Sequence, residues 1–208
     1  MDMTPFVDVA FLILTFFIMA TKFKAPEPVQ VTTPNSVSVK EVEEGDALLV
    51  TFDSSGRVFF GLSSEANNVK MDLIKHMNET RNLNLTQAEM VNYVKAGSVG
   101  VPFGNLKQLL SVTPEEQKDF KQPGIPLDTA GGELYYWIRD AISIFTNKKL
   151  AYRIKGDNFA KYPVFKMVLK AFTRNDINKF QMITMMEDAP PGTELAIIRN
   201  RQKAGGGK

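Results

Sequence analysis

A single carboxylate interrupts an otherwise apolar N-terminal stretch, and it limits what this segment can become. Residues 4–21 read TPFVDVAFLILTFFIMAT, in which Asp8 is the only charged residue. A charge deep in a bilayer costs about 2.5–3.5 kcal/mol on insertion scales, so an acid in a membrane helix usually faces a partner or a water-filled path. The segment therefore predicts a transmembrane helix over residues 1–22 in which Asp8 carries protons.

The length of the apolar run leaves two other structures to be weighed. From Pro5 to Thr21 a helix extends roughly 25 Å, at the lower edge of what crosses a hydrocarbon core of about 30 Å. A cleaved signal peptide needs basic residues at its start, but Asp2 and Asp8 come before any Lys or Arg. A helix of a soluble domain needs a polar face, and phenylalanines on every side leave none. An anchor fits the sequence better than either.

Helical spacing places the polar groups inside this segment on one side. Thr4 is expected as the N-cap and Pro5 at the first helical position, where its missing N–H is not needed. Residues three and four apart share a face, and the stripe through Asp8 contains Phe11, Leu12, Thr15 and Met19. We expect Asp8, supported by Phe11, Leu12 and Thr15, to line a channel while the other sides meet lipid or a surrounding subunit. A Thr15 hydroxyl bonded back to its own helix is an equal alternative.

The residues of this segment also resemble a known family. The motif Thr4-Pro5-Phe6-Val7-Asp8-Val9, followed by Leu14-Thr15-Phe16-Phe17-Ile18-Met19, is similar to the transmembrane signature of the ExbD/TolR family, stator-type proteins of proton-driven motors in Gram-negative envelopes. The close similarity ends near residue 35, and the rest matches in architecture only. It implies that Asp8 is the protonatable aspartate. It also implies a homodimer inside a ring of ExbB-like subunits, with a periplasmic domain that engages a TonB-like partner.

Two features depart from the family pattern. Only Met1-Asp2-Met3 precede the motif, where family members usually carry a cytoplasmic tail. Lys22 and Lys24 follow the helix and no basic residue precedes it, so the positive-inside rule alone places the domain on the wrong side. A missing basic tail accounts for both. We therefore expect the family orientation, a single-pass anchor in the bacterial inner membrane with its C-terminal domain in the periplasm.

Composition argues for one anchored domain without catalytic machinery. The 208 residues leave enough chain behind an anchor for a single core. A net charge of +2 and the lack of a basic stripe argue against a nucleic-acid partner. The sequence has no Cys, phosphate loop, His cluster or nucleophile elbow, so we expect no enzyme activity, no cofactor and no bound metal. The single histidine, His76, is expected at the surface.

The chain changes character after the anchor. Residues 23–36 contain three prolines and alternating valines, which predict an extended linker that cannot continue the helix. Val29 and Val31 fall on one side of an extended segment and suit pairing with the same strand of a second copy. An unpaired tether is the alternative.

Residues 37–200 predict an α+β periplasmic domain of the two-layer type, with helices packed on one sheet. Residues 83–131 are expected to form a helical insertion, because capping-box signatures begin at Thr86 and Thr113 and glycines and prolines separate them. The tail over 201–208 is expected to be disordered. The elements expected around the insertion are a hairpin over 47–52 and 57–61, helices over 69–80, 133–147 and 162–175, strands over 149–155 and 179–186, and an edge strand over 194–199.

These patterns predict an ExbD-like subunit that couples the proton-motive force to TonB-dependent transport at the outer membrane. A TolR-like role in envelope integrity shares the same helix motif. A third possibility belongs to another class: a proton-independent, membrane-tethered adaptor or cell-wall-binding module in which Asp8 only helps the helices assemble.

Overall fold

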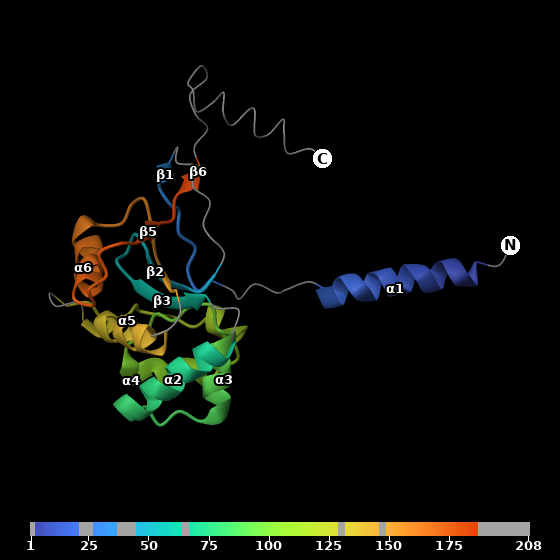
Figure 1. The fold of residues 1–208 in the computed structure, drawn as a ribbon, viewed down its shortest axis with the longest axis horizontal. Helices are drawn as coiled ribbons and strands as arrows, with labels where there is room; N and C mark the ends of the chain where they lie inside the picture. Colours follow the sequence, from blue (N-terminus) through green and yellow to red (C-terminus); the bar gives the residue numbers. More distant parts are fainter. Residues whose placement is uncertain are drawn as a thin grey trace, which may run out of the picture.

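The computed structural model describes residues 3–20, 27–36, 45–63, 67–128, 132–145 and 149–186. They form an N-terminal helix, α1 (Thr4–Ala20), and an α+β domain with a mixed sheet (Figure 1). The α+β class predicted from the sequence is thus confirmed, while the transmembrane character of the N-terminal helix stays a prediction. The expected edge strand over 194–199 and the tail over 201–208 lie outside the described residues.

A four-stranded sheet in the order β3-β2-β4-β5 forms the centre of the domain. Strand β2 runs antiparallel to β3 and parallel to β4, and β4 runs parallel to β5. The predicted hairpin connects β2 to β3. Its turn is closed by Asp53, whose carboxylate accepts hydrogen bonds from Arg57 N at 2.9 Å and Ser55 Oγ at 2.8 Å, and by Gly56 at φ 89°. The strands span β2 (Ala47–Phe52), β3 (Val58–Ser63), β4 (Ala151–Gly156) and β5 (Gln181–Met182).

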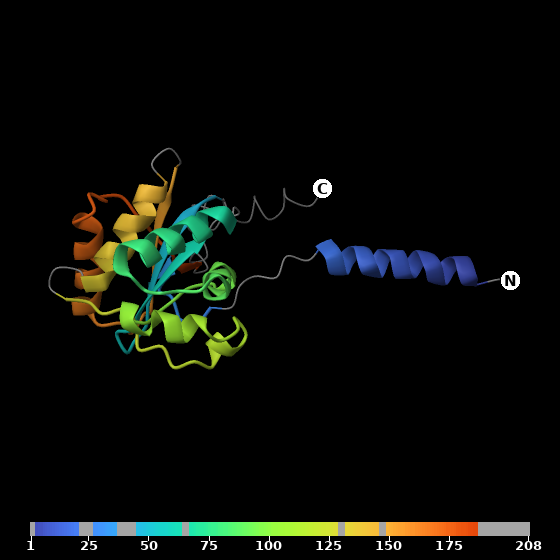
Figure 2. The same ribbon diagram turned by 90° about the horizontal axis from the view of Figure 1, so that it is seen from below.

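Helices cover one face of this sheet. They are α2 (Asn67–Arg81), α5 (Gly132–Ile144) and α6 (Tyr162–Thr173). In Figure 2, α2 (teal) and α5 (yellow) lie in front of the strands, and α6 (orange) lies at the left next to α5. The Trp137 ring of α5 stacks on Phe60 of β3 with centroids 4.9 Å apart, and Phe172 of α6 meets Tyr152 of β4 at 6.4 Å. Because strand side chains alternate, these residues bury one face of the sheet and leave the other for different contacts.

The described part of the predicted insertion, residues 83–128, contains helices, as predicted, and shares the core of the domain. It forms α3 (Gln87–Lys95), α4 (Phe103–Leu110) and a 3₁₀ turn, η1 (Glu116–Lys118). Thr86 and Glu89 make the predicted capping box before α3. Thr113 and Glu116 exchange the same bonds, but only η1 follows them. That this segment is an insertion relative to other family members stays a prediction.

The same segment also closes the outer edge of β3. Val99 and Phe60 exchange two backbone hydrogen bonds of 2.8 Å, and Ile125 N donates to Val58 O at 2.8 Å. An open edge strand is a template for unwanted strand pairing, so this cover removes a site of aggregation.

The single strand expected over 179–186 is wrong. Two short strands replace it: β5 joins β4 in the main sheet, whereas β6 (Met185–Met186) pairs parallel with β1 (Asn35–Ser36). A period-two pattern predicts a strand but does not reveal which partner strand is within reach. Here the partner changes from β4 to β1 after Ile183, whose N–H donates to Ile154 O at 2.8 Å.

Candidate functional site

The helix α1 carries Asp8 among exposed apolar side chains. It has 17 residues, and Phe6, Phe11 and Leu12 are each more than 60 % exposed. Among the described residues, no helix reaches both the length and the hydropathy of a membrane span. Val7 N donates to Met3 O at 3.2 Å, so Met3 holds the N-cap position that we expected for Thr4. Pro5 is then the second helical residue, whose missing N–H again needs no partner.

Thr15 bonds back to its own helix. Its Oγ1 donates to Leu12 O at 2.9 Å and to Phe11 O at 3.0 Å, which is the alternative considered from the sequence. The hydroxyl oxygen keeps lone pairs that can still accept a hydrogen bond. Asp8, Phe11 and Leu12 are exposed on the same stripe, so α1 offers a carboxylate and a hydroxyl oxygen to whatever packs against that side.

The tether that follows α1 docks on its own domain. Lys155 Nζ donates to Glu27 Oε2 at 2.6 Å. Further along, Thr32 N donates to Asp157 Oδ2 at 3.2 Å, and Asn158 N donates to Thr32 O at 2.8 Å. With the β1–β6 pair, these bonds hold residues 27–36 beside the carboxyl end of β4. Residues 27–36 therefore lie along their own domain, while the division into anchor, linker and domain stays a prediction.

Val29 and Val31, the two valines predicted to pair with a second copy, both lie in this docked segment. Val29 lines a cavity against the sheet, and Val31 is half-buried. Pairing of these valines with a second copy stays a prediction.

The cavity lies on the face of the sheet opposite the helices. Its volume is about 450 Å³. Leu49 of β2, Gly61 of β3 and Arg153 of β4 are paired neighbours in the sheet and form its floor. The tether forms one wall, and Lys70 of α2 lies on another. We call this cavity the sheet groove.

Cationic side chains dominate the polar part of the sheet groove. Arg153 and Lys155 alternate along β4, so both point to the groove face. Arg153 Nε donates to Gln181 Oε1 at 3.3 Å, and Lys155 is the partner of Glu27. Burial lowers the pKa of Lys70. The groove can therefore attract an anion, because a low-dielectric wall strengthens the field of these charges.

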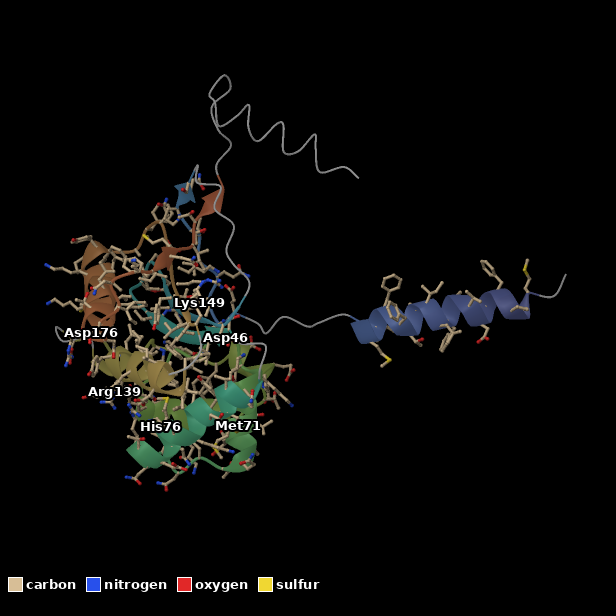
Figure 3. All side chains as sticks on the ribbon, viewed as in Figure 1. Asp46, Met71, His76, Arg139, Lys149 and Asp176 are labelled. Atoms are coloured by element: carbon tan, nitrogen blue, oxygen red, sulfur yellow. The ribbon has the colours of Figure 1, made fainter. Side chains whose placement is uncertain are left out.

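A second charged cluster lies between the helices and serves packing. Asp140 of α5 is 1 % exposed and accepts from Arg81 Nη1 at 2.5 Å and from Arg139 Nε at 3.2 Å. The Arg81 guanidinium also lies 4.8 Å from the centroid of the Phe103 ring. Arg139 reaches the surface of α5 (Figure 3).

A carboxylate from α5 caps a neighbouring helix. Glu133 Oε2 accepts from Phe103 N at 2.8 Å, and so supplies the start of α4 with the side-chain cap that Pro102 lacks. Burial raises the pKa of Glu133, an effect partly offset by that hydrogen bond and by Arg81. No three His, Asp or Glu residues lie close enough together to hold a metal in the part of the chain that the structure describes. His76 lies on α2, half-buried, on the side of the domain remote from the sheet (Figure 3).

The sequence pointed to the residues of α1 and to Val29, but not to the charged residues of the sheet groove. Arg153 and Lys155 carried a usable signal, since two cations at alternate positions of a half-buried strand must share a face. Lys70 and Glu27 carried none, because each reaches the groove from a distant element.

The described part of the chain thus consists of an apolar helix that bears one acid, a docked tether and an α+β domain. The family model described as "Biopolymer transport protein ExbD/TolR" matches residues 1–186. The chain therefore belongs to the ExbD/TolR family, as the motif over residues 4–9 predicted. A search of curated proteins and a search of solved structures found no match.

Proposed function

We propose that this protein is an ExbD-like subunit of an inner-membrane proton channel that powers TonB-dependent transport across the outer membrane. The observation that carries the proposal is the family match over residues 1–186, which includes a helix with a single carboxylate in an apolar sequence. In this function α1 spans the membrane once, and the domain lies in the periplasm and engages a TonB-like protein.

Asp8 is the proton carrier in this proposal. Moving one elementary charge through a membrane potential releases about 2.3 kcal/mol per 100 mV, which is the energy available to the motor for each proton. Asp8 takes up a proton from one side and gives it to the other, alternating between neutral and charged forms. The Thr15 oxygen, seven residues further on the same stripe, is placed to accept a hydrogen bond from a water or a partner in that path.

Two copies of α1 inside a ring of ExbB-like subunits complete the channel. A lone helix cannot enclose a water path, and its exposed apolar side chains need lipid or protein around them. The tether then connects this ring to the periplasmic domain.

Proton flux through the reconstituted complex tests the proposal. The full chain and an ExbB-like partner are placed in vesicles with an imposed proton gradient, and a pH-sensitive dye reports the flux. We expect Asp8→Asn to reduce flux to the level of protein-free vesicles, because the amide cannot carry a proton at this position. Asp72→Asn, an exposed acid on α2, is the matched control and should conduct like the native chain.

Retained flux in Asp8→Asn contradicts the proton-channel function. A complex that also keeps full transport activity with this substitution would instead favour the adaptor that needs no protons.

A further inference from the structure

The sheet groove contains an ammonium group, that of Lys70, for which the described residues supply no counterion. Lys70 lies on its wall, and no hydrogen bond or ion pair joins Lys70 to the described residues. Its side chain is only half-exposed, and burial lowers its pKa. An unpaired charge held away from water costs free energy, so an anion beside Lys70 would be stabilising.

The charge of the groove lining points the same way. Lys70, Arg153 and Lys155 line it, and Glu27 is the one acid among the described lining residues. Glu27 is already bound to Lys155 at 2.6 Å. The lining therefore has an excess of positive charge, which favours a ligand with a carboxylate or another anionic group.

Much of the remaining lining is apolar, with the hydroxyls of Thr51, Ser63 and Ser98 among it, and it fits side chains better than free ions. Val29, Leu49 and Ile183 contribute apolar surface around the cations. A volume of about 450 Å³ lies in the range of pockets that hold organic ligands, roughly 300–1,000 Å³. A small hydrated anion would leave most of this apolar surface uncovered.

The tether shows which kind of molecule this face accepts. Glu27-Pro28-Val29 is a short acidic peptide seated on the groove, with its carboxylate on a lysine and its valine against the sheet. Lys70 offers the same type of contact elsewhere on the groove lining, where no acid of the described residues pairs with it.

We propose that the sheet groove binds an extended acidic peptide segment of a partner protein, with a carboxylate on Lys70 and the neighbouring apolar side chains on Leu49 and Ile183. The docked tether forms one side of the site. This inference takes from the proposed function only that the domain acts on another protein, and it does not depend on Asp8.

Binding of two matched peptides to the full chain in detergent micelles tests the inference. The probes are the end-blocked peptides AVEVA and AVQVA, which differ by one charge. Methyl-labelled Leu and Ile and ¹⁵N-labelled Lys side chains report their position by NMR. We expect AVEVA to bind at least fivefold more tightly than AVQVA, and to shift the signals of Leu49, Ile183 and the Lys70 ammonium.

Two substitutions on α2 distinguish binding at the groove from a nonspecific effect of the protein's positive charge. Lys70→Met keeps the aliphatic stem and removes the charge, so AVEVA should then bind no better than AVQVA. Lys75→Met removes an exposed charge from α2 and should leave the fivefold preference intact. The preference should also survive in Asp8→Asn, so failure of the proton-flux test and failure of this one are distinguishable.

Several results would overturn the inference. Equal binding of the two peptides, shifts that map outside the groove, or a preference that survives in Lys70→Met each contradict it. Soluble cell-wall fragments also carry carboxylates. If they shift the groove signals at lower concentrations than AVEVA, the site belongs to a glycan ligand and not to a protein segment.

Discussion

Removing the Asp140 carboxylate should destabilise the domain strongly. Asp140 is 1 % exposed and bonds to Arg81 of α2 and to Arg139 of its own helix. In Asp140→Ala the Arg81 guanidinium loses its counterion while its side chain stays only 14 % exposed. The loss in the free energy of unfolding therefore comes both from the lost hydrogen bonds and from the Arg81 charge that stays buried without a partner.

The magnitude follows from that burial. Breaking a buried ion pair by removing one partner costs about 3–5 kcal/mol. Arg81 keeps its stacking on Phe103 and some contact with water, so we expect the lower end, about 3 kcal/mol. For a chain of this size that corresponds to a drop of roughly 6–12 °C in Tm. Arg139→Gln should cost less than about 1 kcal/mol, because that side chain is 45 % exposed.

Urea unfolding followed by tryptophan fluorescence measures these values. The chain has a single tryptophan, Trp137, which is fully buried one turn before Asp140 and stacks on Phe60 and Tyr93. The double variant Arg81→Met/Asp140→Ala leaves no buried uncompensated charge, because the remaining partner of Asp140, Arg139, is 45 % exposed. It should be destabilised by at least about 1 kcal/mol less than the sum of the single variants. A loss under about 1 kcal/mol in Asp140→Ala, or strict additivity, would refute the reasoning.

Two further predictions concern pH and the tether. Burial raises the pKa of Glu133 in the folded state above its unfolded value of 4.5. As pH rises, the unfolded state therefore loses this proton first, so Glu133 lowers the free energy of unfolding above about pH 4.5. Glu133→Gln should therefore gain stability relative to the native chain between pH 4 and pH 7 in urea unfolding, and a difference independent of pH contradicts this. In this cysteine-free chain, single cysteines placed at residues 29–33 test strand pairing between copies under oxidising conditions. Pairing predicts crosslinking maxima at Val29 and Val31, and Asp157→Ala, which loosens docking of the tether, should raise them. A flat profile leaves only a tether docked on its own domain.

Interactions between residues close in the sequence made most of the helices and the hairpin predictable. The Asp53 turn, the Thr86 capping box and the apolar spacing of α2, α5 and α6 depend on residues within a few positions of one another. The predicted hairpin and these helices were accordingly found. The strand over 179–186 failed because its partner changes from β4 to β1, and that change is decided by segments about 150 residues apart in the sequence.

The sequence by itself determined the apolar helix, its single acid and the family, because each is written in consecutive residues whose spacing fixes their common face. Only the tertiary structure decided where the tether lies. Glu27 meets Lys155 across 128 positions, and Lys70 reaches the same groove from a helix that packs on the opposite side of the sheet. Such contacts depend on which elements the whole core brings together, and no local periodicity encodes them.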